Sequence, residues 1–105
     1  MPSREKLISW LGANKQIGVV FDFDRVEGKY WSSVGVQKWN SVFKVYVDEI
    51  LESEMDAENY AREEIVSFTS VEEAIDFVEN DTNANLEQLA PCKGQKIFNP
   101  AFDNP

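Results

Sequence analysis

A strand followed at once by a capped helix is predicted between Glu63 and Glu79, and this stretch limits the folds open to the chain more than any other. Residues 63–68 are typical of a short strand. Ser70 and Glu73 then fit a capping box, in which the serine hydroxyl accepts from the Glu73 N–H and the glutamate side chain reaches back to the Ser70 N–H. The helix carries one apolar stripe at the i, i+3, i+4, i+7 spacing, formed by Val71, Ala74, Ile75 and Val78. Such a stripe must be buried against another layer, so a helix packed on a sheet is expected.

Apolar periodicity and turn residues predict the elements before this stretch. We expect a helix from Arg4 to about Ala13, and a strand over Gln16–Asp24 whose alternate residues share an apolar face. Gly28 marks a hairpin turn, because it can take a positive φ. The segment from Tyr30 to about Trp39 is expected to be a strand with a bulge near Gly35.

Residues 42–51 are compatible with two structures. A strand would turn one set of alternate residues inward, namely Phe43, Val45 and Val47. It would leave the other set outward, namely Lys44, Tyr46 and Asp48. A helix would instead align Phe43, Val47, Ile50 and Leu51 along one stripe. The β-branched and aromatic content favours a strand that turns helical near its end.

The rest of the chain is expected to be less regular. Residues 52–61 are predicted to form a long acidic loop or frayed helix, and residues 86–89 one short helical turn. Residues 93–105 are expected to be a loosely structured tail, attached to the body by Ile97, Phe98 and Phe102. Residues 1–105 then form a single domain of the α+β class. We expect an antiparallel sheet of about four strands, with helices at both ends packed on one face.

Negative charge is concentrated in the middle third of the chain. The formal net charge is −9, from 19 acidic and 10 basic residues. Residues 48–81 contain thirteen carboxylates and one basic residue, Arg62, which gives 1 − 13 = −12 and leaves +3 for the remainder. These carboxylates either serve as solvated surface or create a field that steers a cationic partner. The same charge opposes direct binding to nucleic acid or to an anionic membrane.

The residue types that are missing exclude many kinds of site. The chain has no histidine, so histidine-based catalytic triads and histidine-ligated zinc are excluded. Cys92 is the single cysteine, and no glycine-rich phosphate loop is present. We therefore expect no catalytic residues, no metal and no cofactor. With no secretory signal and no apolar run of roughly 20 residues, a cytoplasmic protein without a membrane partner is expected.

Residues 18–26, GVVFDFDRV, resemble the first motif of the haloacid dehalogenase phosphatases, in which an apolar strand ends in DxD. That resemblance implies a magnesium-dependent phosphatase with Asp22 as nucleophile and Asp24 as general acid/base. Three features depart from the motif: Arg25 replaces a small residue, the next segment reads as a turn into a strand rather than a crossover helix, and no later GDxxxD-type motif follows. The alternative is a core strand whose acidic positions meet solvent or pair with lysine and arginine across the sheet.

Three aromatic residues, Tyr30, Trp31 and Trp39, are more typical of a core than of a binding site. Tryptophan and tyrosine are nevertheless enriched at binding hot spots. An exposed member of this group beside the acidic segment would be an apolar anchor ringed by charge.

In size, acidity and layout the whole chain resembles the immunity proteins that bacteria make against their own polymorphic or contact-dependent toxins. The resemblance implies a non-catalytic inhibitor that neutralises a basic partner, a cognate toxin nuclease domain, with carboxylates standing where substrate phosphates would bind. A nucleic-acid mimic that blocks a DNA-binding protein is an alternative with the same electrostatics, and the small phosphatase is a third hypothesis. The expected partner-binding residues are Tyr46, Asp48, Glu49, Glu52, Glu54, Asp56, Glu58, Tyr60, Glu63 and Glu64.

Overall fold

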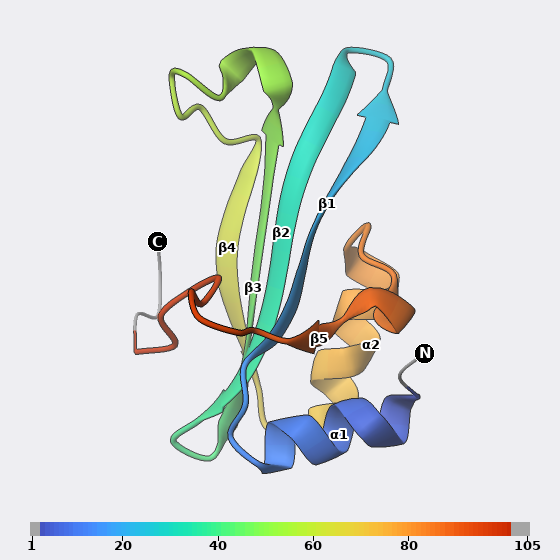
Figure 1. Ribbon diagram of the computed structural model, residues 1–105, viewed down its shortest axis with the longest axis vertical. Coiled ribbons are helices and arrows are strands. Elements are labelled where there is room, and N and C mark those ends of the chain that lie inside the picture. The colour runs from blue at the N-terminus through green and yellow to red at the C-terminus, as the bar shows by residue number, and fades with distance from the viewer. Residues whose placement is uncertain (1–2, 102–105) are drawn as a thin grey trace.

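The computed structural model describes residues 3–101 and has an α+β fold built on one antiparallel sheet (Figure 1). Five strands lie in the order β4-β3-β2-β1-β5, and every neighbouring pair is antiparallel. The chain runs through α1 (Arg4–Gly12), β1 (Ile17–Arg25), β2 (Gly28–Trp39), β3 (Val42–Leu51), η1 (Glu52–Glu54), β4 (Arg62–Phe68), α2 (Val71–Asp81), η2 (Leu86–Gln88) and β5 (Ala90–Pro91). The meander of four strands is as predicted, and residues 42–51 form a strand as their composition favours, but the strand runs to Leu51 and the helical end expected for it is wrong. The two-residue strand β5 was not expected.

Both helices pack on the same face of the sheet and form the main core with it. Leu7 and Leu11 of α1 and the predicted stripe residues Ala74, Ile75 and Val78 of α2 are buried in one cluster. The sheet contributes Ile17, Val34, Val36, Val45 and Val47 to this cluster. The helices cover only part of the sheet, because the ends of β1, β2 and β3 nearest the β1–β2 turn and η1 extend beyond them (Figure 1).

The cap of α2 differs in one detail from the capping box expected. The Ser70 hydroxyl accepts from the Glu73 N–H at 3.1 Å, as predicted. The Glu73 carboxylate, however, accepts from the hydroxyls of Ser70 and Thr69 rather than from the Ser70 N–H. These hydroxyls are donors on the same turn, so the carboxylate is satisfied without reaching back to the backbone.

The second face of the sheet is covered in part by the chain that follows β5. Gly18 of β1 and Gly35 of β2 are direct partners in the sheet, and the β2–β3 register continues past Gly35 without interruption. The predicted bulge is therefore wrong. A Cβ atom at Gly35 would lie 3.0 Å from the Phe98 ring, and one at Gly18 would meet Ile97 and lie 2.8 Å from the Val34 carbonyl oxygen. The two glycines let the returning chain approach the sheet closely.

Gln16 fixes this returning chain with its side-chain amide. Its Oε1 accepts from the Ile97 N–H at 2.8 Å, and its Nε2 donates to the Phe98 carbonyl at 2.9 Å and to Gln37 Oε1 at 2.8 Å. The Phe98 ring then stacks on Tyr46, with the ring centroids 5.6 Å apart. Residues 93–101 contain no helix or strand, as expected, yet Phe98 is buried. Phe102 lies outside the described residues.

Tyr46, one of the outward residues of β3, lies under this cover, because the Phe98 ring stacks on it. Lys44, Tyr46 and Asp48 lie on the face away from the helices, as the alternation predicts, but all three are buried. Their expected exposure is therefore wrong, because the sequence pattern of β3 contains no sign of what lies above it. Among residues 3–101, no helix is both long and apolar enough to cross a membrane.

Candidate functional site

The acidic loop, residues 52–61, joins β3 to β4 at the end of the sheet that extends beyond the helices (Figure 1). Two of its carboxylates accept hydrogen bonds from neutral groups: Glu52 from the Trp31 indole N–H at 2.9 Å, and Glu54 from the Asn59 amide at 3.1 Å. Asp56 and Glu58 are exposed. Within residues 3–101, none of these four carboxylates belongs to an ion pair. The loop therefore presents negative charge that the described part of the chain does not neutralise.

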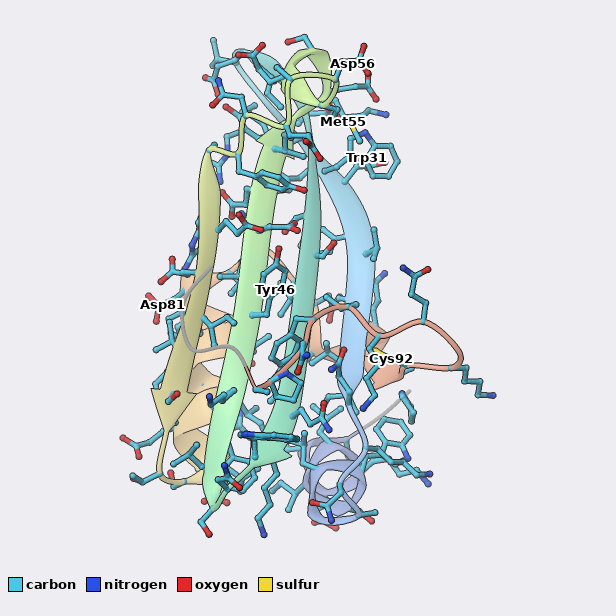
Figure 2. All side chains as sticks on the ribbon, turned by 90° about the vertical axis from the view of Figure 1, so that its left-hand side faces the viewer. Trp31, Tyr46, Met55, Asp56, Asp81 and Cys92 are labelled. Carbon is cyan, nitrogen blue, oxygen red and sulfur yellow. The ribbon has the colours of Figure 1, made fainter. Side chains whose placement is uncertain are left out.

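A small hollow lies beside this loop, on the face of the sheet away from the helices. It has a volume of about 180 Å³ and is lined by Val20, Trp31, Ser32, Ser33, Asp48, Ile50, Met55 and Tyr60. Trp31 and Met55 lie next to each other there, close to Asp56 at the same end of the sheet (Figure 2). The bond from Trp31 to Glu52 ties the loop to β2, so the loop and the hollow form one structural unit.

Asp48 is a buried carboxylate in the wall of the hollow. Only 9% of the residue is exposed, and its Oδ1 accepts from the Ser33 backbone N–H at 2.7 Å. Burial raises the pKa of Asp48 above its ordinary value, although the hydrogen bond from Ser33 acts in the opposite direction. Within residues 3–101, no lysine or arginine forms an ion pair with it.

The Tyr46 hydroxyl links Asp48 to a second carboxylate. Its oxygen lies 2.9 Å from Asp48 Oδ2 and 2.9 Å from Glu63 Oε2. Because a phenol has one proton, it can donate fully to only one of these oxygens at a time. Burial is also the main reason that the pKa of Tyr46 is raised above its ordinary value. The three groups thus form an acidic cluster in which a proton on Asp48 would supply the missing donor.

Tyr60 stands at the rim of the hollow and is 41% exposed. Partial burial raises its pKa, and the charges of Asp48, Glu63 and Glu58 raise it further. Tyr60 is therefore an accessible aromatic ring among carboxylates, as the sequence led us to expect. Tyr46, the other predicted anchor, is instead buried beneath Phe98.

Two of the predicted partner-binding residues, Glu49 and Glu64, lie on the helix side of the sheet and meet a cation of the chain itself. Arg62 Nε is 2.7 Å from Glu64 Oε2, and Arg62 Nη1 is 3.7 Å from Glu49 Oε2. Asn83 also donates to Glu49. The structure therefore does not bring these two residues together with the hollow.

The acidic residues of α2 are separate from the loop as well. Asp76 and Glu79 pair with Arg4 at 2.7 Å and 3.6 Å. Asp81 lies at the opposite edge of the sheet from Trp31 and Met55 (Figure 2). The thirteen carboxylates counted in the sequence are thus divided among three places: the helix side, where several are paired, the loop, where four are not, and the face away from the helices, where Asp48 and Glu63 lie.

The two aspartates of the phosphatase-like motif lie exposed on β1. Asp22 is 3.9 Å from Lys29 across the hairpin, and Asp24 pairs in register with the same residue. The antiparallel sheet differs from the parallel sheet and crossover helix that this resemblance implies. Among residues 3–101, no group of three acidic or cysteine side chains converges on a point where it could hold a metal ion.

Sequence reasoning missed most of the apolar lining of the hollow. Val20, Ile50 and Met55 come from two strands and the loop, and only the sheet register brings them together. A usable signal was the large apolar side chain of Met55 inside an acidic segment. Comparison with protein-family models, with curated proteins and with solved structures finds no match, so the site is interpreted from its own chemistry.

Proposed function

We propose that this chain is a cytoplasmic, non-catalytic inhibitor of the immunity-protein type, which binds and neutralises a basic partner through the acidic loop and the hollow beside it. The partner suggested by the resemblance of the whole chain is a toxin nuclease domain. The observation that carries the proposal is the set of four loop carboxylates that stand together, outside any ion pair within residues 3–101. Carboxylates of this kind can form ion pairs with lysine and arginine side chains of a second protein.

The two parts of the site suit two steps of association. Unscreened carboxylates at one end of an elongated molecule orient a cationic partner and accelerate the encounter. The exposed Met55 and Tyr60 and the Trp31 ring then offer apolar contact area within that ring of charge. Nuclease domains bind phosphate through lysine and arginine, so an acidic loop seated on those residues would occupy the substrate site.

A charge-reversal variant tests this proposal, and its probe is the basic, toxin-like protein that the proposal requires to be encoded beside the gene in the source organism. Glu54, Asp56 and Glu58 are each replaced by lysine, while Glu52 is kept because it holds Trp31. We expect the association rate constant to fall by more than about tenfold, and to lose most of its dependence on salt. Stopped-flow fluorescence of the tryptophans at several salt concentrations measures both.

The matched control reverses three carboxylates on α2, namely Glu72, Asp76 and Glu79. Both variants change the net charge from −9 to −9 + 6 = −3, and the helix variant in addition breaks the ion pairs of Arg4 with Asp76 and Glu79. The helix variant should associate within about threefold of the unmodified chain, since α2 lies away from the loop (Figure 1). Equal slowing of both variants, or no binding of the neighbouring protein, contradicts the proposal. Capture of a DNA-binding protein instead would favour the nucleic-acid mimic.

A further inference from the structure

We propose that the hollow is the seat of a single lysine side chain of the partner, whose ammonium group meets the carboxylate of Asp48. This inference rests on the proposed function and names the residue that would anchor the complex. It is carried by three observations: the size of the hollow, the exposure of its walls, and a carboxylate, Asp48, that has no ion pair within residues 3–101.

The size of the hollow suits one long side chain. Pockets that bind small molecules usually enclose about 300–1,000 Å³, whereas this hollow measures about 180 Å³. The hollow is therefore too small for a nucleotide or a comparable cofactor, and large enough for an aliphatic stem with a polar head.

The walls of the hollow are unusually apolar for a free surface. Five large hydrophobic side chains are exposed among residues 3–101, and three of them line this one site: Val20 at 62%, Met55 at 44% and Tyr60 at 41%. Trp31 and Ile50 add to the lining. Apolar side chains gathered at one place on a surface mark a contact site, and the methylene stem of a lysine is a ligand that such walls can bury.

The carboxylate of Asp48, in the wall of the hollow, determines which polar head group the hollow would bind. Asp48 is nearly buried, and its neighbours Glu63 and Tyr46 are an acid and a phenol that supply no positive charge. A buried carboxylate without a counter-charge is unfavourable, so a cation that enters the hollow gains an interaction which the free protein lacks.

The hydrogen bonds of Asp48 favour lysine over arginine. Each of its oxygens already accepts one bond, Oδ1 from the Ser33 N–H and Oδ2 from the Tyr46 hydroxyl. A guanidinium group binds a carboxylate best as a fork that engages both oxygens side by side. An ammonium group is a compact charge that needs only one free lone pair, and therefore fits the geometry that remains.

A peptide titration on the full chain tests directly whether the hollow binds a lysine side chain. The probes are acetyl-Gly-Lys-Gly-amide and its norleucine counterpart, which keeps the stem and lacks the charge. Nuclear magnetic resonance of the Trp31 indole N–H and the Met55 methyl group reports binding at the hollow itself. We expect the lysine peptide to bind about tenfold more tightly than the norleucine peptide.

Three variants distinguish lysine binding in the hollow from general attraction of a cation to an acidic surface. Asp48→Asn keeps the acceptor for Ser33 and should abolish the preference for lysine. Asp24→Asn removes the same charge from an exposed position of β1 outside the hollow, and should leave the preference within about twofold of its original value. Val20→Lys places a lysine in the wall, two strands from Asp48, and should prevent binding of the peptide by occupying the hollow from within.

Equal affinity for the two peptides would overturn the inference, and so would equal losses in Asp48→Asn and Asp24→Asn. The seat and the proposed function can fail separately. If the neighbouring toxin-like protein binds with the salt dependence described above but dissociates at the same rate from Asp48→Asn and from the unmodified chain, the seat is wrong while the proposed function stands. If that protein does not bind at all, the proposed function is wrong.

Discussion

Asp48 is a residue whose burial is explained neither by the core nor by the hydrogen bonds it makes. A carboxylate taken out of water needs either a counter-charge or several donors, and this one has the Ser33 N–H and a share in a single phenolic proton. An asparagine at this position would satisfy the cluster better. Its oxygen would accept from Ser33, its amide would donate to Tyr46, and the Tyr46 proton would be left for Glu63.

We therefore predict that Asp48→Asn stabilises the free protein at neutral pH while it weakens partner binding. The raised pKa of Asp48 means that the folded state holds this proton to higher pH than the unfolded state does. Stability from this group is thus full below the unfolded value of about 3.9, falls as the pH rises from there through the folded pKa, and stays low at neutral pH. The gain from Asp48→Asn should be the inverse of this profile, present at pH 7 and absent near pH 3.

Urea unfolding of the two proteins between pH 3 and pH 8 measures this difference, with Asp24→Asn as the control. The ionisable groups that surround Asp48 are Tyr46, Tyr60 and Glu63, and all remain in both proteins. A variant that is less stable than the unmodified chain by the same amount at every pH would show that hydrogen bonding, rather than charge, dominates at this position.

At the scale of the elements, the sequence predicts structure well where local signals act alone. The alternation in β1, the serine cap of α2 and the β-branched content of β3 each decide an element from adjacent residues. What the second face of the sheet would meet could not be predicted, because Gln16 and Phe98 are 82 residues apart and no local pattern links them. Gly35 was interpreted as a bulge for the same reason, since its purpose is visible only with Phe98 above it.

Of the candidate site, too, only the part with a local sequence signal could be predicted. The acidic loop follows from a count of carboxylates in the sequence, whereas the hollow depends on the register that sets Val20, Ser33 and Asp48 side by side on three strands. Glu49 and Glu64 were assigned to the binding surface because they are close to the loop in sequence. Their strand positions turn them to the other face, where Arg62 lies.

The returning chain after β5 is expected to act as part of the fold and not as a loose extension. Phe98→Ala removes a buried ring that stacks on Tyr46, and such truncations of buried phenylalanine typically destabilise by about 3–5 kcal/mol. We predict a loss of about 3 kcal/mol in the free energy of unfolding, measured by urea denaturation. Water reaching Tyr46 should also lower its pKa toward the ordinary value, because burial is the main cause of the rise.

The matched control for this variant is Phe23→Ala. Phe23 stacks on Tyr30 with the ring centroids 5.5 Å apart, but it is only half-buried and lies outside the main core cluster. It should cost less stability and leave the ultraviolet titration of Tyr46 unchanged. If Phe98→Ala is as stable as the unmodified chain, the cover on the second face contributes nothing and Tyr46 is protected in another way.

For the whole molecule, what matters is the distribution of charge along its length. The molecule measures 37 × 29 × 26 Å, with the acidic loop toward one end and the helices toward the other (Figure 1). Arg4 and Arg62 lie with the carboxylates of α2 and of the helix side, and none of the ion pairs within residues 3–101 includes a loop carboxylate. The free protein therefore holds like charges together at one end, and a basic partner would relieve that repulsion on binding.

This arrangement predicts how salt should change the stability of the free protein. Salt screens repulsion between exposed charges, so the melting temperature of the unmodified chain should rise by a few degrees as sodium chloride is raised from about 0.01 M to about 0.15 M. The loop-reversal variant, with lysine at positions 54, 56 and 58, should lose most of this rise because lysines then share the loop with Glu52 and the like charges there are gone. The helix variant, with lysine at positions 72, 76 and 79, carries the same net charge but keeps the crowded loop, so most of the rise should remain. Differential scanning calorimetry of the three proteins provides the comparison, and identical salt dependence in the two variants would mean that net charge matters and its place on the molecule does not.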